Sequence, residues 1–287
     1  QSNDVVSREG QLARLSAQEV DVLVVGGGIV GAGVARDAAL RGLRTAIIEQ
    51  RDFASGTSSR SSRLLHGGLR YLAQGRIGLV REASREKRVI GHIAPHLAQP
   101  LAFIFPGRKG SSWVLWQLAI GVKVYDALCG MRNFGRSTVL GKKKTTEVLR
   151  GVSTQNLTGA VRYFDALTND ARLVMDTVRS AAQHGATVLN YTRLAAAERS
   201  GERWNCTLED METGAKYELK SRTVVNATGP WSDKVPHSNT SLRLTKGVHL
   251  VIDRHRLPVP DAVVMAEGSR ILFAIPWGER VILGTTD

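Results

Sequence analysis

Three glycines, Gly26, Gly28 and Gly31, follow a short apolar run and open a segment with helical spacing of apolar residues. In that context the pattern Gly-x-Gly-x-x-Gly allows a tight turn, a close approach of the backbone to a pyrophosphate, and close packing of the helix. The N-terminus of the helix then attracts the negative charge. The motif predicts a phosphate-binding turn, and a glycine-rich turn between packed elements is the alternative that needs no ligand.

Glu49 ends the next apolar run, eighteen residues after Gly31. An acidic side chain at this place can accept hydrogen bonds from the ribose hydroxyls of an adenosine. It would repel a 2′-phosphate on that ribose, so we expect an unphosphorylated one. The glycines and Glu49 together predict a dinucleotide site, which FAD and NAD would both fit.

A hydroxyl-rich stretch follows at residues 55–62. Its hydroxyl and backbone donors lie where the phosphates and ribityl chain of a longer cofactor would run, which favours FAD over NAD. A helix N-cap followed by a loop would explain the same composition without a ligand. The cofactor-binding residues predicted here are Thr57, Ser58, Ser59, Ser61 and Ser62.

A second glycine pair, Gly67 and Gly68, stands between His66 and Arg70. Paired glycines let the backbone approach a flat ring, and the imidazole and the guanidinium flank that gap. Taken alone, His66 could be a hydrogen-bonded structural residue and Arg70 a surface charge. The surrounding sequence must therefore decide whether these four residues bind a ligand or have a structural role.

Residues 55–72 closely resemble the FAD-dependent, quinone-linked glycerol-3-phosphate dehydrogenases, within the D-amino-acid-oxidase-like flavoproteins. The resemblance covers residues 20–287, and its ordered motifs are far more specific than one glycine pattern. The further segments that agree, in chain order, are 52–54, 94–97, 169–173, 226–231, 246–249, 275–277 and 284–287.

The resemblance implies hydride transfer from carbon 2 of sn-glycerol 3-phosphate to flavin N5, giving dihydroxyacetone phosphate, with a membrane quinone as electron acceptor. It implies that Arg70 contacts the substrate and that His66 lies beside the flavin. An imidazole there could accept the proton of the substrate hydroxyl or hydrogen-bond near the ring. Ala227 and Gly229 resemble the second strand end that contacts the flavin, although a tight turn would also explain them.

Alternating short apolar runs and helical patterns predict a mixed α/β (α+β) chain. We expect a Rossmann-like FAD-binding domain of the D-amino-acid-oxidase-like type with an interleaved antiparallel substrate domain. The expected strands are 20–25, 45–49, 186–191 and 223–227 with a hairpin at 204–219, and the expected helices are 29–40, 79–92 and 165–184.

The FAD-binding domain is predicted to be discontinuous, at residues 1–90 and 155–235. Residues 91–154 and 236–287 are predicted to form parts of the substrate-binding domain. Members of the family continue past the segment that ends at Asp287, so the resemblance implies that the C-terminal remainder of that domain is absent. The chain would then be an N-terminal fragment.

The formal charge of +13 favours an anionic partner, such as a phosphorylated substrate or an acidic lipid surface. The basic residues are scattered and no nucleic-acid-binding motif accompanies them, so nucleic acid is not expected. Cys129 and Cys206 lack the spacing of a metal or redox site, and we expect neither metal nor disulfide. We expect a cytoplasmic location, peripheral on the inner face of the cytoplasmic membrane.

The segment 113–128 is apolar and is followed by basic residues. It could be an interfacial membrane patch or a core helix beside a solvated basic loop. Two other functions also remain open. The protein could be a related FAD oxidase that uses oxygen, and the truncated chain could be a non-catalytic FAD- or ADP-binding module.

Overall fold

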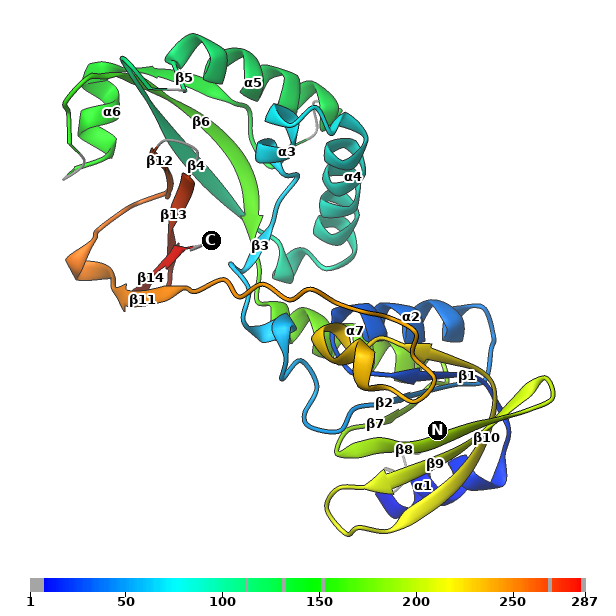
Figure 1. Ribbon diagram of the computed structural model, residues 1–287. Coiled ribbons are helices and arrows are strands. Elements are labelled where there is room, and N and C mark those ends of the chain that lie inside the picture. Colours follow the sequence, from blue (N-terminus) through cyan, green and yellow to red (C-terminus); the bar gives the residue numbers. More distant parts are fainter. Residues whose placement is uncertain (1–7, 112, 131–132, 151–152, 268–269, 285–287) are drawn as a thin grey trace. The chain divides into compact units, whose positions relative to one another are not determined.

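The computed structural model describes residues 8–111, 113–130, 133–150, 153–267 and 270–284. It divides into two compact units (Figure 1). The first unit comprises Gln1–Ser61 and Asn169–Leu244, and the second comprises Ser62–Thr168 and Thr245–Asp287. No helix in the described part of the chain combines the length and apolar character needed to span a bilayer.

The first unit is built on a sheet with the strand order β7-β2-β1-β10-β9-β8. The strands β7, β2, β1 and β10 pair in parallel, and β10, β9 and β8 pair antiparallel. The strands are β1 (Val20–Val25), β2 (Thr45–Ile48), β7 (Thr187–Leu189), β8 (Thr192–Ser200), β9 (Arg203–Asp210) and β10 (Lys216–Asn226).

Helices cover both faces of this sheet because the parallel strands are apolar on both sides. Leu23 faces α1 (Arg8–Ala17), whereas its neighbour Val24 faces α2 (Ile29–Leu40), and both side chains are fully buried. Small residues on α2, such as Ala35, let that helix approach the sheet closely. Helix α7 (Asp170–Gln183) packs against α2.

The second unit is built on a mostly antiparallel sheet with the strand order β11-β14-β13-β12-β4-β6-β3, and β5 also pairs with β6. The strands are β3 (Leu64–Leu65), β4 (Gln99–Arg108), β5 (Thr138–Gly141), β6 (Leu157–Leu167), β11 (Leu250–Asp253), β12 (Ala262–Glu267), β13 (Arg270–Trp277) and β14 (Arg280–Gly284). The helices are α3 (Leu69–Ala73), α4 (Ile77–Ile93), α5 (Leu115–Leu128) and α6 (Lys142–Val148).

The core of the second unit lies between α5 and the strands β4 and β6. Phe103 stacks on Tyr163 with ring centroids 5.2 Å apart, and Tyr125 from α5 meets Tyr163 edge-on at 6.0 Å. These rings belong to one buried cluster, and the Tyr125 hydroxyl also contacts the loop between β3 and α3 at the Gly67 amide. The core therefore supports that loop as well as the sheet.

Several predicted elements are confirmed, and others differ at their boundaries. The strand 20–25 and the helix 29–40 form as expected. The helix expected from Asp165 begins only at Asp170, because residues up to Leu167 complete the pairing of β6 with β4. The expected buried strand 223–227 is the end of β10, and it is only partly buried.

The two compact units also differ from the predicted domain boundaries. Residues 62–90, expected in the FAD-binding domain, pack in the second unit, because Leu64 and Leu65 pair with β6 and Val80 of α4 enters the core of that unit. Residues 155–168 pack there too because they contain β6, which pairs with β4. Which unit binds cofactor and which binds substrate stays a prediction.

Candidate functional site

Three predicted site segments of the first unit follow neighbouring parallel strands. Gly26 follows β1, Glu49 follows β2, and Ala227 follows β10. The Gly26 amide donates to the Ile48 carbonyl at 2.9 Å, and the Ala227 amide donates to the Val25 carbonyl at 2.8 Å. Since the carboxyl ends of parallel strands share one edge of a sheet, this is where α/β folds bind ligands.

A cavity of about 550 Å³ opens at this edge of the sheet. Seven residues predicted to bind the cofactor line it, namely Gly26, Gly28, Glu49, Thr57, Ser58, Ala227 and Gly229. All of its lining residues belong to the first unit. The structure therefore brings together residues that lie up to about 200 positions apart in the sequence.

The backbone requires glycine at two positions of the turn. Gly26 has φ +114°, and a Cβ there would lie 2.5 Å from the Ala227 carbonyl oxygen. A Cβ on Gly31 would overlap the carbonyl oxygen of Gly26. Gly31 does not line the cavity, and instead it lets α2 begin directly against the turn. Gly28 lines the cavity, where its backbone is open to a ligand.

The Glu49 carboxylate is held at the mouth of the turn. Its Oε2 accepts a hydrogen bond from the Gly27 amide at 2.8 Å, and its Oε1 accepts one from the Arg51 amide at 2.9 Å. An ionised carboxylate has about four acceptor positions, so lone pairs remain for ribose hydroxyls. The hydrogen bonds from these two amides fix the directions of the remaining lone pairs before a ligand binds.

The first turn of α2 is completed by the hydroxyl-rich stretch. The Ser58 hydroxyl accepts a hydrogen bond from the Ile29 amide at 3.0 Å, and residues Thr57–Ser59 form a short 3₁₀ turn beside it. Ser58 thus caps a helix that begins 29 residues earlier and still lines the cavity. The capping explanation and the ligand explanation apply to the same side chain.

Other hydroxyls of this stretch bond within the protein. The Ser59 hydroxyl donates to the Gly56 carbonyl at 3.2 Å, and the Ser61 hydroxyl donates to Oδ2 of Asp170 at 2.6 Å. Neither serine lines the cavity. Their predicted cofactor contacts stay predictions.

The remaining predicted residues belong to the second unit. Ser62 Oγ lies 3.0 Å from Nε2 of His249, and His66 is exposed. Gly67 is buried, and Gly68 adopts φ +75° at the N-cap of α3. The backbone of Arg70 lies in α3, but its side chain falls outside the described part of the structure. His249 occurs in one of the segments that carry the resemblance, yet nothing in the sequence indicated its bond to Ser62.

Sequence reasoning missed several residues that line the cavity. Arg51, Arg193 and Lys234 add positive charge around Glu49, and Trp231 adds an aromatic surface. Arg51 could have been found because it follows Glu49 by two positions. Arg193 could not, since it lies on β8 and only the fold places it here. The cations suit a cavity that receives a phosphorylated ligand.

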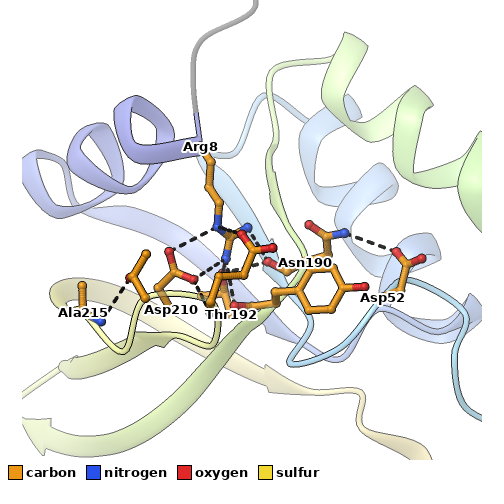
Figure 2. A network of polar contacts seen from close by, with 9 residues as sticks. Arg8, Asp52, Asn190, Thr192, Asp210 and Ala215 are labelled. Carbon is orange, nitrogen blue, oxygen red and sulfur yellow. Dashed lines mark hydrogen bonds and ion pairs between the residues drawn. The ribbon is translucent and has the colours of Figure 1, made fainter.

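A polar network from α1 supports the wall of the cavity (Figure 2). Arg8 donates to the carbonyls of Asn190 at 2.6 Å and Tyr191 at 2.8 Å, and to Oδ1 of Asp210 at 3.0 Å. Hydrogen bonding from the Arg8 guanidinium lowers the pKa of Asp210 below its usual value. Thr192, which follows Tyr191 in the chain, lines the cavity, and its amide donates to the Glu49 carbonyl at 2.8 Å.

The family profile described as FAD dependent oxidoreductase matches residues 21–287. The chain is 40% identical over 295 residues to the aerobic glycerol-3-phosphate dehydrogenase of Staphylococcus saprophyticus, an alignment that covers 100% of this chain and 53% of that protein. It is 41% identical over 281 residues to glycerol-3-phosphate dehydrogenase 2 of Mycobacterium tuberculosis, covering 96% of this chain and 48% of that protein.

The fold is similar to the crystal structure of the glycerol-3-phosphate dehydrogenase from Bacillus halodurans complexed with FAD. The TM-score is 0.78 at 31% identity, and the match covers 98% of this chain and 50% of that one. The chain spans about half the length of the curated relatives it matches. The expected fold class and flavoprotein family are confirmed, and the chain belongs to the family of FAD-dependent oxidoreductases.

Proposed function

We propose that this chain forms the FAD-binding part, and some of the substrate-binding part, of an enzyme that oxidises sn-glycerol 3-phosphate to dihydroxyacetone phosphate. The substrate is supported by the names of the relatives, which are about 40% identical over nearly the whole chain. The cofactor is supported by the cavity of the first unit. The hydrogen bond from the Gly27 amide to the Glu49 carboxylate is the observation that carries the proposed cofactor site.

The residues present fit the adenosine and pyrophosphate end of FAD. Gly26 and Gly28 line the cavity beside the first turn of α2, where the N-terminus of the helix favours the negative charge of a pyrophosphate. Glu49 accepts the ribose hydroxyls, and the backbone of Ala227 and Gly229 forms the opposite wall. The ligand thus replaces water at groups that the fold has already oriented.

In this proposal the residues that act on the substrate come from the segment 66–70 of the second unit. The bound flavin supplies the hydride acceptor. His66 accepts the proton of the substrate hydroxyl as the hydride leaves, and its exposure keeps it accessible to a substrate. Arg70 pairs with the phosphate, for which a guanidinium offers two parallel donors. A quinone receives the electrons afterwards.

FAD titration, followed by quenching of flavin fluorescence, tests the cofactor site. Glu49→Ala should weaken FAD binding by about tenfold or more, because a charge-assisted hydrogen bond contributes about 1.5–3 kcal/mol. Glu198→Ala is the matched control, since Glu198 is exposed on β8 and does not line the cavity. Equal affinities of the Glu49→Ala and Glu198→Ala variants would refute the site.

Anaerobic bleaching of the flavin by glycerol 3-phosphate tests the reaction. The holoenzyme should lose its visible absorption without added nicotinamide, and a quinone analogue should restore it faster than oxygen does. Rapid recovery in oxygen with release of peroxide would instead identify an oxidase. Absence of bleaching in an FAD-loaded protein would leave only a nucleotide-binding module.

A second proposed property is peripheral binding to an anionic membrane through α5. Trp116, Ile120 and Val124 form one stripe along this helix, and Trp116 and Ile120 are 64% and 57% exposed. The opposite face, including Val122, is buried in the core. Both explanations of the segment 113–128 thus apply to different faces of one helix. The net charge of +13 complements anionic lipid headgroups.

A further inference from the structure

The backbone of Gly67 lies on a buried cluster of three polar side chains. Its amide donates to the hydroxyl of Tyr125 at 2.9 Å and to Oδ1 of Asp165 at 3.2 Å. Lys87 Nζ lies 2.5 Å from the same Asp165 oxygen, and the Tyr125 hydroxyl donates to that oxygen at 2.6 Å. Oδ1 of Asp165 thus accepts hydrogen bonds from the Lys87 ammonium, the Tyr125 hydroxyl and the Gly67 amide.

The three side chains come from three different elements, α4, α5 and β6. Lys87 is 2% exposed, Tyr125 is fully buried, and Asp165 is buried with them. Burial, followed by the negative charge of Asp165, raises the pKa of Tyr125, so its hydroxyl remains a donor at any working pH. The cluster therefore ties the elements of the second unit to one peptide of the loop.

Stability alone does not account for a buried ion pair of this kind. Removing two charges from water costs several kcal/mol per ion, and well-packed apolar side chains of similar volume are often as stable or more so. A charged acceptor, however, fixes its donors at short distances and in defined directions. We propose that Lys87, Asp165 and Tyr125 form a positioning cluster that holds Gly67 and so sets the place of His66.

The geometry of the loop makes it responsive to this cluster. A Cβ on Gly67 would overlap the Tyr125 hydroxyl, so the peptide lies in direct contact with it. Gly68 follows in the left-handed region at φ +75° and starts α3. The Gly67 amide belongs to the same planar peptide as the His66 carbonyl, so the hydrogen bonds that hold Gly67 also fix the backbone of His66. That His66 acts on a bound substrate rests on the proposed function.

Tyr125→Phe in the FAD-loaded protein tests the proposal, with Tyr163→Phe as the matched control. Both variants remove one hydroxyl from adjoining buried rings, but only Tyr125 bonds the loop. Amide hydrogen exchange of residues 65–68 should accelerate about 5–10-fold in Tyr125→Phe alone, since the Gly67 amide loses one of its two acceptors. Equal exchange rates in the two variants would show that the cluster does not hold the loop.

The rate of flavin reduction distinguishes a positioning role of the cluster from a role in stability alone. In Tyr125→Phe the rate of flavin reduction by glycerol 3-phosphate should fall about 10–100-fold, since misplacement by about 1 Å can cost that much. The FAD dissociation constant should not change. Faster loop exchange with an unchanged reduction rate would overturn the positioning role.

Failure of the proposed function gives a different result. If the wild-type protein binds FAD but glycerol 3-phosphate does not reduce it, the substrate assignment fails. The exchange experiment still decides whether the cluster holds Gly67, because it needs no substrate. The two hypotheses therefore fail separately.

Discussion

Gly31 offers a test of the turn at the scale of one residue. Gly31→Ala places a methyl group against the Gly26 carbonyl, so the helix or the turn must shift. We expect the free energy of unfolding to fall by about 1–3 kcal/mol, the usual cost of overpacking. FAD binding should weaken with it. Urea unfolding followed by circular dichroism measures the first effect.

Gly33→Ala is the matched control on the same helix. A Cβ at Gly33 meets no atom within 4 Å, and the position is exposed. Replacing a helical glycine by alanine should stabilise the protein by about 0.5–1 kcal/mol, because the unfolded chain loses conformational freedom. The same substitution two residues apart should therefore act in opposite directions. Equal changes at both positions would contradict the packing of α2 on the turn.

At the scale of elements, Arg8 contributes polar contacts that hold α1 on the sheet, beside the buried Leu12 and Leu15. Arg8→Ala leaves the buried Asp210 carboxylate without its guanidinium partner. Asp210 keeps the hydrogen bond from the Glu212 amide at 2.9 Å but loses its charged donor. A hydrogen bond to a charged group contributes about 1.5–3 kcal/mol, so we expect a loss of that size in the free energy of unfolding. Arg14→Ala, at an exposed position of the same helix, should change it little. Similar losses in both variants would show that the network of Figure 2 does not anchor α1.

The same pair predicts a pH dependence. The pKa of Asp210 is lowered in the folded protein, with the Arg8 hydrogen bond as the largest cause. Its contribution to stability is therefore present above the unfolded pKa near 3.8 and is lost as the pH falls through the lower folded value. The difference in unfolding free energy between wild type and Asp210→Asn should be constant near neutral pH and shrink below about pH 3.8. A difference that grows on acidification would contradict the pair.

The elements that the sequence predicted best are those specified by local pattern. The strand 20–25, the helix 29–40 and Glu49 lie close together in the chain, and their glycine and apolar spacing carries the information. By contrast, the helix expected at 165–184 takes in the last residues of β6, because the pattern does not say where strand pairing ends. Only the pairing of β6 with β4 fixes that boundary.

At the scale of the whole molecule, the exposed stripe of α5 predicts binding to lipid. Co-sedimentation with anionic vesicles should be strong at low salt and weaker at high salt, because lipid charge contributes to it. Trp116→Ser combined with Ile120→Ser should reduce it about tenfold or more, since each buried apolar side chain contributes about 1.5–3 kcal/mol. Val139→Ser, at another exposed apolar position, is the control. Unchanged sedimentation of the double variant would exclude α5 as the contact.

The arrangement of the whole chain was the least predictable level. The resemblance implied a discontinuous cofactor domain, and the structure also interleaves its two compact units. The chain nevertheless passes from the first unit to the second at Ser62 rather than near residue 90, because Leu64 and Leu65 join the sheet of the second unit. Long-range partners such as Arg8 with Asp210, or Arg193 with the cavity, leave no local pattern in a single sequence.

The placement of β10 beside β1 has a consequence for biosynthesis. The wall that Ala227 contributes to the glycine turn leaves the ribosome about 200 residues after the turn itself. Until then β1 has an unpaired edge where β10 will later add. The nascent protein should therefore capture its nucleotide only after most of this sequence has been translated, and chaperones that shield open sheet edges should engage it during that interval.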